Sequence, residues 1–399
     1  MILSEERKLI VFLGGSEDHV SFLRASKSIG FHSVVFDLDN KCVSRKEADL
    51  FFKISTHDFE GILLKLKELS EEYCITGVMT YSSSPKAILN TSKISAHFGT
   101  KSYSFESASM TIDKSLMKKA FLENDVPTAD ARITRNAKEA IDFFENCGQQ
   151  TMIMKPSSGV SGSAGITFIK SAEDIANHYD HVSSFSTDSI VIIESFINGD
   201  EYSIDGIISK NDPIILSVCK KNSLGKSENF IMSGFTSVTK SSTSEDEVFF
   251  ERMEDATVKA LKALKISDSL FSLDIIVSRN EVNVVECGIL LDCKIDRLLS
   301  FMGINIYEMM ISVISGQSIS SPKIDISSPV SLNFLFANKS GYFQINQDAV
   351  DQFRGQIFWE KSPGSLVSKP KSISDILGWT ISVEESIAQK ELYFLNESV

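Results

Sequence analysis

A lysine that precedes a glycine- and serine-rich loop is the stretch of this sequence best suited to binding phosphate. Lys155 follows an apolar run, and residues 157–165 (SSGVSGSAG) contain no side chain larger than valine. Small residues let the backbone approach a ligand closely and point several N–H groups at phosphate oxygens, while lysine adds a point charge. The residues that we expect to contact phosphate are Lys155, Ser161, Gly162 and Ser163. Taken alone, the stretch is equally typical of a surface hairpin.

Two carboxylates on neighbouring strands form a second candidate site. Asp274 lies in one apolar run, and Glu286 ends the next, after a turn at Arg279. We expect strict alternation to place Val282, Val284 and Glu286 on one face of the returning strand, with Asp274 and Glu286 together near the open end of the hairpin. Converging carboxylates favour a cation between them, and oxygen-only ligands suit Mg²⁺. Two solvated carboxylates would explain the spacing equally well.

Two further segments could contribute to the same chemistry. An apolar run ends at Glu194, and Phe196, Ile197 and a Gly-x-Glu sequence with Glu201 follow it. This pattern predicts an apolar wall with carboxylates that accept hydrogen bonds from a sugar or an amino group, although each glutamate singly is more typical of a solvated strand end. Lys114 opens a predicted helix, where helix amides could face a phosphate.

The elements that must position these residues alternate between β and α over about the first hundred residues. Apolar runs predict strands, helical spacing predicts helices, and glycines mark the turns between them. The predicted strands are 8–13, 33–38 and 75–80, and the predicted helices are 20–29, 62–69 and 85–98. Such alternation indicates an open, mostly parallel sheet.

The rest of the chain is mixed in pattern. Strands are predicted at 151–154, 166–169, 189–194, 202–208, 272–277 and 282–286, and helical segments at 172–178 and 296–314. The last seventy residues contain short strand-like runs, and we expect a final helix over Glu384–Leu395.

Composition limits the function further. A net charge of −13 over 399 residues argues against a partner with a phosphate backbone, so we expect no nucleic acid. The longest apolar runs are far shorter than a membrane span, and the N-terminus lacks a signal-peptide pattern. Six cysteines stand without metal-ligand spacing and are typical of reduced thiols. We expect a cytoplasmic protein without a membrane partner.

In their order and spacing, these features resemble the ATP-grasp superfamily as far as about residue 320. The resemblance rests on Asp113-Lys114 at the start of a helix, on Lys155 before the glycine-rich loop, on Glu-x-Phe-Ile before Gly-x-Glu, and on the Asp274/Glu286 pair. The tail is similar to that of carboxylate–amine ligases of the L-amino-acid ligase group, in the Gly341-Tyr342 and 378–385 stretches.

The resemblance implies a fold of α/β and α+β type. It consists of a Rossmann-like pre-ATP-grasp domain (1–110), an ATP-grasp domain whose two α+β lobes clasp ATP (111–320, lid lobe about 145–205), and a small mixed C-terminal domain (321–399). A homodimer is a further expectation from the family.

The resemblance also implies ATP-dependent ligation of a small-molecule carboxylate to an amine. The implied substrates are amino-acid-like small molecules, and the implied intermediate is an acyl phosphate, with ADP and phosphate released. ATP and Mg²⁺ are the implied cofactors, with Mn²⁺ as a substitute. The nucleotide would be held by Lys114, Lys155, Ser161, Gly162, Ser163, Glu194, Phe196, Ile197 and Glu201, and the metal by Asp274 and Glu286.

One departure from the family pattern concerns catalysis. Four residues after the second metal carboxylate the family usually has arginine, and this chain has Leu290. Arg297 or Lys294 could substitute for it as the catalytic cation, and Asp292 could assist the metal. The alternatives are a nucleotide-binding protein with a regulatory role that lost catalysis, and a carbamoyl-phosphate-type ligase that differs only in substrate.

Overall fold

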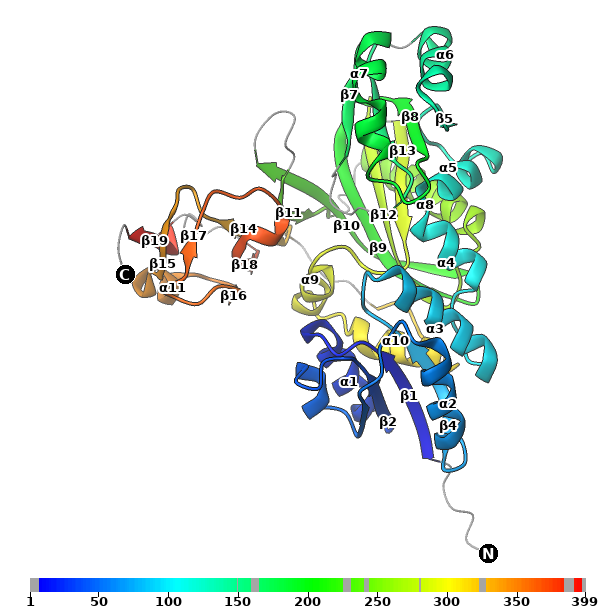
Figure 1. Cartoon of the computed structure of the whole chain (residues 1–399). Helices are drawn as coiled ribbons and strands as arrows, with labels where there is room; N and C mark the ends of the chain where they lie inside the picture. The colour runs from blue at the N-terminus through cyan, green and yellow to red at the C-terminus, as the bar shows by residue number, and fades with distance from the viewer. Residues whose placement is uncertain are drawn as a thin grey trace, which may run out of the picture.

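The computed structural model describes residues 7–148, 150–158, 165–224, 231–239, 244–279, 281–322, 328–383 and 391–396. The N-terminal unit, the lid lobe and the C-terminal strands project from a central antiparallel sheet (Figure 1). The predicted combination of α/β and α+β architecture is therefore confirmed.

The N-terminal unit is a parallel sheet with strand order β3-β2-β1-β4. Its strands are β1 (Arg7–Leu13), β2 (His32–Phe36), β3 (Leu50–Phe52) and β4 (Tyr73–Met79), and its helices are α1 (Glu17–Ser28), α2 (Phe59–Leu69) and α3 (Pro85–Phe98), with a 3-10 turn, η1, at Val43–Lys46. Residues Leu9 to Leu13 are fully buried because helices cover both faces of the sheet. Gly99 ends α3 in the left-handed conformation, with φ 67°.

Two helices lead from this unit to the lid lobe: α4 (Phe105–Ile112) and α5 (Lys114–Glu123). The Asp113 carboxylate caps α5 by accepting from the N–H groups of Ser115 and Leu116. The Lys114 N–H donates to the Ser157 carbonyl at 2.8 Å. The start of α5 is thus fixed against the strand that delivers Lys155.

A second antiparallel sheet, with order β5-β8-β6-β7, is covered by two helices and overlaps the predicted lid lobe of about residues 145–205. We use the name lid lobe for residues 131–195, while the action of this unit as a lid stays a prediction. Its elements are β5 (Ala131–Thr134), α6 (Ala137–Cys147), β6 (Met152–Pro156), β7 (Thr167–Ile169), α7 (Ala172–Ser183) and β8 (Val191–Ser195). Strands β6 and β7 pair from Met152 with Ile169, which confirms the predicted strand–loop–strand unit. Ser161, Gly162 and Ser163 lie outside the described residues.

The central sheet has eight strands in the order β13-β12-β9-β10-β11-β14-β18-β16. They are β9 (Asp200–Ser209), β10 (Asp212–Leu224), β11 (Ile231–Ser237), β12 (Ser269–Ser278), β13 (Glu281–Gly288), β14 (Ser331–Phe336), β16 (Gln356–Trp359) and β18 (Ile376–Ser382). Helices α8 (Ser244–Ala263), α9 (Ile295–Phe301) and α10 (Ile306–Ile314) belong to this part of the chain.

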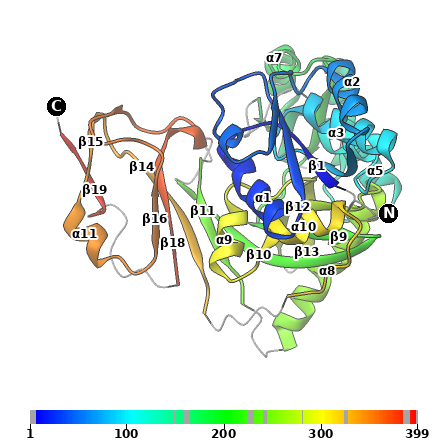
Figure 2. The same ribbon diagram turned by 90° about the horizontal axis from the view of Figure 1, so that it is seen from below.

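The C-terminal strands stand to one side of the molecule (Figure 2). A separate three-stranded sheet, β17-β15-β19, packs there with α11 (Gln347–Gln352). Its strands are β15 (Gly341–Ile345), β17 (Leu366–Val367) and β19 (Tyr393–Asn396), while a 3-10 turn, η2 (Ile373–Asp375), contacts β11 of the central sheet. Strands β14, β16 and β18, however, continue the central sheet. We therefore keep a C-terminal domain from residue 321 as a proposal, with a sheet that is shared across its boundary.

The predicted final helix over Glu384–Leu395 is wrong at its end. Residues 384–390 lie outside the described part of the chain, but Tyr393–Asn396 forms β19, in which Leu395 pairs with Phe343. Tyr393 is buried and Phe394 is exposed, as in a strand with one covered face. Pairing with β15, together with the aromatic residues Tyr393 and Phe394, favours a strand over the end of a helix.

The prediction that Val282, Val284 and Glu286 share a face is also wrong. Asp274 pairs with Glu286 while Ile275 pairs with Val284, so Val285 is an extra residue in the ladder. This β-bulge changes the alternation. Val282 and Val284 point into the core, and Glu286 lies on the opposite face.

Helices α9 and α10 fill the space between the central sheet and the N-terminal unit, in one core with Phe22 and Phe235. In the ranges that the structure describes, no single helix is long and apolar enough to cross a membrane. Only α9 and α10 taken together pass by length and composition, and they are bent by 113°.

Candidate functional site

The first part of the site is a buried pair of lysines that share one carboxylate. Glu194 Oε1 lies 2.6 Å from Lys155 Nζ, and its Oε2 lies 3.0 Å from Lys118 Nζ. All three side chains are at most 8% exposed. Burial alone would raise the pKa of Glu194, but Lys155 and Lys118 outweigh it and hold that pKa below its ordinary value. The two predicted residues, Lys155 and Glu194, are therefore in direct contact.

Strand alternation explains why these residues meet. Met152 and Met154 of β6 and Ile193 of β8 point into the core of the lid lobe, so Lys155 and Glu194 emerge on the other face of the sheet.

The second part of the site is the pair of carboxylates on the central sheet. Asp274 and Glu286 are directly opposite each other in the ladder, which confirms that they share one end of the hairpin. Glu286 Oε2 accepts a hydrogen bond from Lys114 Nζ at 2.5 Å. Partial burial opposes ionisation of Glu286, but Lys114 keeps its pKa below the ordinary value.

Lys221 of β10 joins the remaining carboxylates. Its Nζ lies 2.6 Å from Asp274 Oδ1, 2.9 Å from Asp292 Oδ2 and 3.4 Å from Glu201 Oε1. Burial opposes the charge of Lys221, but the carboxylates raise its pKa well above the ordinary value. Burial and the nearby acidic groups likewise raise the pKa of Asp274. One ammonium thus faces three carboxylates, and the cluster has an excess of negative charge.

Asp205 fixes the backbone of Asp292, one of the carboxylate residues around Lys221. It is fully buried on β9, where its Oδ1 accepts from the Asp292 N–H at 3.0 Å and its Oδ2 accepts from the Ser203 hydroxyl at 2.5 Å. Burial, together with the charge of Asp292, raises the pKa of Asp205 to about 6. These bonds fix the loop that carries Asp292 toward Lys221.

The residues present fit a magnesium ion that also binds phosphate. Within the described residues, no group of three His, Cys, Asp or Glu side chains could hold a metal by itself. Mg²⁺, however, commonly takes one or two protein carboxylates and completes its shell with phosphate oxygens and water. Asp274 and Glu286 offer such oxygens on opposed strand positions, and a cation there would relieve the excess negative charge.

Phe196, Ile197 and Glu201 line the connection from the lid lobe to the central sheet. The Phe196 ring meets the Phe168 ring edge-on, with 5.2 Å between the centroids. The Glu201 side chain is 51% exposed and reaches Lys221. An apolar surface beside an exposed carboxylate could accept the base and ribose of a nucleotide.

Lys294 and Arg297 lie where α9 faces α1. Lys294 Nζ is 3.5 Å from Asp18 of α1 and 3.7 Å from Glu360 of the C-terminal region. Arg297 donates to the Ser21 hydroxyl at 3.2 Å, and its Nε lies 3.4 Å from Asp296. Their role as catalytic cations therefore stays a prediction, with contacts that connect them to the N-terminal unit.

Three functional candidates were missed from the sequence: Lys118, Lys221 and Asp205. Lys118 follows Lys114 by four residues, and this spacing places both lysines on one face of α5. That spacing was a usable signal. Lys221 and Asp205 are single polar residues in strands, and their importance depends on which strands become neighbours.

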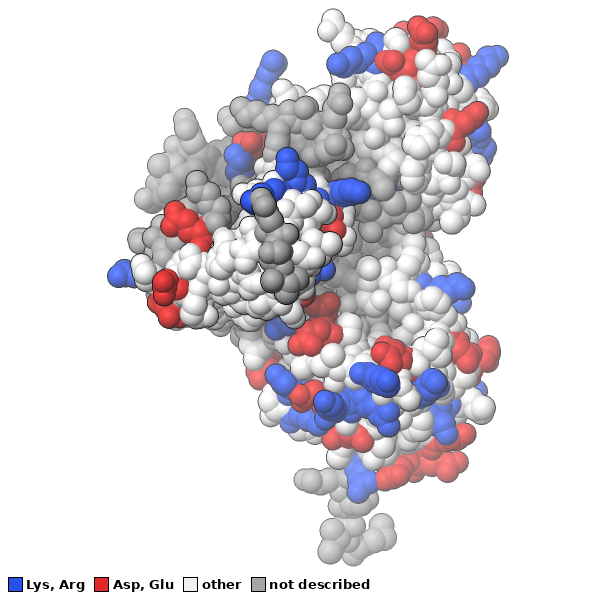
Figure 3. Space-filling model, turned by 60° about the vertical axis from the view of Figure 1, so that its left-hand side comes forward, with Lys and Arg blue, Asp and Glu red and all other residues white. Residues whose placement is uncertain are grey.

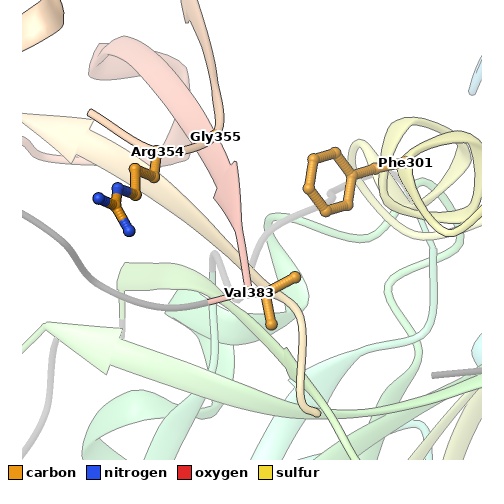
Figure 4. A pocket seen from close by; sticks show the side chains of 4 residues that line it. All are labelled: Phe301, Arg354, Gly355 and Val383. Atoms are coloured by element: carbon orange, nitrogen blue, oxygen red, sulfur yellow. The ribbon is translucent and has the colours of Figure 1, made fainter. Parts of the chain in front are cut away.

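A pocket and the distribution of surface charge complete the description of the molecule. A pocket of about 450 Å³ is lined by Phe301, Arg354, Gly355 and Val383, where α9 meets the C-terminal strands (Figure 4). On the face shown in Figure 3, lysines and arginines of the described part are interspersed with acidic residues rather than collected into one basic surface. The residues that line the pocket include none of the predicted site residues.

Comparisons with known proteins support the family and the fold. Residues 111–288 match the model of the ATP-grasp domain. The chain is 30% identical over 219 residues to D-alanine–D-alanine ligase of Clostridium botulinum, covering 53% of this chain and 70% of that protein. It is 23% identical over 194 residues to the arginine-specific large chain of mitochondrial carbamoyl phosphate synthase from Neurospora crassa, covering 47% of this chain but only 16% of that one. The L-amino acid ligase structure from Bacillus licheniformis shares the fold, with a TM-score of 0.75 and 15% identity over 97% of this chain and 95% of that one.

Proposed function

The chain belongs to the ATP-grasp superfamily, and from that premise we propose that it is an ATP-dependent carboxylate–amine ligase. The observation that carries the proposal is the convergence of Lys114 with Glu286, of Lys155 with Glu194, and of Lys221 with Asp274. Cations and oxygen ligands are what phosphoryl transfer needs, because catalysis there rests on positioning and on neutralising charge.

In this proposal, the lysines hold the phosphates and the carboxylates hold the metal. Lys114, Lys155 and Lys221 would bind phosphate oxygens of ATP, and Phe196, Ile197 and Glu201 would contact its base and ribose. Glu194 would contribute to the nucleotide site by holding Lys155 in place. Asp274 and Glu286 would ligate Mg²⁺, which would neutralise negative charge on the phosphates. The loop residues Ser161, Gly162 and Ser163 are proposed to cover the phosphates.

The proposed reaction has two steps. A carboxylate oxygen of the first substrate attacks the γ-phosphorus, and the bond from that phosphorus to the β–γ bridging oxygen breaks, which releases ADP and leaves an acyl phosphate. The amine of the second substrate then attacks the acyl carbon, the bond from that carbon to the phosphate oxygen breaks, and the nitrogen loses a proton to solvent, which gives an amide and free phosphate. Arg297 or Lys294 is proposed to steady the reacting carboxylate, since Leu290 cannot. Amino-acid-like molecules are the proposed substrates, in the cytoplasm, with a homodimer as the proposed assembly.

Leu290 favours a second candidate, a nucleotide-binding protein with a regulatory role. The retained Lys155, Asp274 and Glu286 favour the ligase, because a site that only binds nucleotide does not need both metal carboxylates.

A substrate screen separates the two candidates. The protein is incubated with Mg-ATP and the twenty amino acids, singly and in pairs, while ADP release and product mass are followed. A ligase releases ADP only with a substrate pair and gives a product one water lighter than their sum. Binding of ATP without release under any pairing, both in the wild type and in Leu290→Arg, would support the regulatory candidate instead.

A further inference from the structure

Helix α5 presents two lysines, one to each side of the proposed nucleotide site. Lys114 and Lys118 are four residues apart and therefore lie on the same face of the helix. Lys114 pairs with Glu286 of the central sheet, whereas Lys118 pairs with Glu194 of the lid lobe. The helix thus contacts both lobes through charged groups.

Lys118 is held from two directions. Its Nζ lies 3.0 Å from Glu194 Oε2 and donates a hydrogen bond to the Thr128 hydroxyl at 2.6 Å. The side chain is only 3% exposed. Burial and the positive charge of Lys155 lower the pKa of Lys118, opposed by Glu194. Burying the ammonium group of Lys118 costs desolvation free energy, which its contacts with Glu194 and Thr128 must offset.

The charge of Glu194 is divided between two lysines. Oε1 accepts a hydrogen bond from Lys155, while Oε2 has the Lys118 ion pair but no hydrogen bond of regular geometry. If Lys118 were absent, the whole carboxylate would be left to neutralise Lys155. With Lys118 present and protonated, the three groups have a net positive charge, which suits a phosphate.

Hydrogen bonds also connect Lys118, through Thr128, to the strand that carries Glu286. Because the Thr128 hydroxyl accepts from Lys118, its proton is free to donate to the Val284 carbonyl, at 2.7 Å. The Val284 N–H donates to the Pro127 carbonyl, also at 2.7 Å. Val284 precedes the bulge residue Val285, which turns Glu286 away from the core. The segment 127–128 therefore fixes the strand edge at the position where its alternation changes.

We propose that Lys118 is a positioning residue of the nucleotide site: it shares the charge of Glu194 so that Lys155 stays available to phosphate, and through Thr128 it fixes the bulge that presents Glu286. This inference rests on the proposed nucleotide site but not on ligation. The ligand chemistry that Lys118 controls is the polyphosphate, not the base.

The test compares binding of ATP and of adenosine to matched variants of the full chain. Lys118→Met should weaken ATP binding roughly tenfold or more, as expected for loss of a charged interaction, and leave adenosine binding within about twofold. Lys118→Arg should restore most of the affinity for ATP. The control is Lys119→Met, which removes the same charge from the exposed side of the same helix, where Lys119 is 61% exposed, and should leave both affinities unchanged.

A second variant tests the connection to Glu286 without a change in charge. Thr128→Val removes the hydroxyl and should reduce the gain in ATP affinity that Mg²⁺ produces, with little effect on metal-free binding. The proposal is overturned if Lys118→Met loses ATP and adenosine affinity equally, or behaves like Lys119→Met, or if Thr128→Val keeps the full magnesium effect. If the wild type binds no ATP, both this inference and the proposed function fail; if it binds ATP but does not ligate, only the ligase proposal fails.

Discussion

Replacing Lys221 by methionine should destabilise the central sheet strongly unless a divalent metal is present. Lys221 is 10% exposed and lies 2.6, 2.9 and 3.4 Å from three carboxylate groups. At an effective dielectric constant of about 20, each contact is worth roughly 5 to 6 kcal/mol before the cost of desolvation. Methionine keeps the length of the side chain but leaves Asp274 and Asp292 without a counter-charge.

The expected net loss is about 3 to 5 kcal/mol, as for removal of one partner from a buried ion pair. For a domain of roughly 200 residues, this corresponds to a fall of the order of 10 °C in melting temperature. Mg²⁺ should recover much of the loss in Lys221→Met, because the vacated position is surrounded by carboxylate oxygens.

The assay is thermal unfolding in EDTA and in millimolar Mg²⁺. Lys220→Met is the matched control. Lys220 is 43% exposed and pairs with Asp200 at the surface, so its replacement should lower the free energy of unfolding by no more than about 1 kcal/mol. The account is refuted if Lys221→Met melts in EDTA at the wild-type temperature, or if Mg²⁺ stabilises it no more than it stabilises the control.

Four other substitutions probe the account. Lys155→Ala should weaken ATP binding by roughly tenfold or more, since the phosphate loses a charged partner; calorimetry showing unchanged affinity would remove it from the site. Glu286→Gln should abolish magnesium-dependent turnover in a folded protein, and full activity would exclude it as a metal ligand. Arg297→Ala should lower ADP release without changing ATP affinity, and an unaffected rate would exclude a catalytic role. Burial lowers the pKa of His19 to about 4 from 6.5, so the unfolded chain binds the proton first as the pH falls. Stability should therefore drop by up to about 3 kcal/mol between pH 7 and pH 4, and a His19→Gln variant with the same slope would contradict this.

Much of the fold follows from local pattern. The βα alternation of the first hundred residues predicts the parallel sheet because short apolar runs alternate with segments of helical spacing. The tight hairpin predicts that Asp274 and Glu286 lie near the same end of the two strands. Their direct pairing needs the bulge in addition, because the register of residues 275–278 would place Asp274 opposite Val285.

The remainder depends on contacts between distant segments. The bulge at Val285 cannot be read from strand spacing, because the 127–128 segment that fixes it comes from another part of the chain. The role of Lys221 becomes visible only in the folded chain, where β10, β12 and the loop with Asp292 lie together. The segment 393–396 becomes a strand because β15 offers it a partner. In each case tertiary pairing outweighs local preference.

The most direct test of the central claim is transfer of oxygen from a carboxylate to phosphate. Amino acids labelled with ¹⁸O in the carboxylate are supplied in pairs with Mg-ATP, and the released phosphate is examined by mass spectrometry. Ligation through an acyl phosphate predicts that one labelled oxygen appears in the phosphate for each amide formed. Amide formation with unlabelled phosphate would contradict the account.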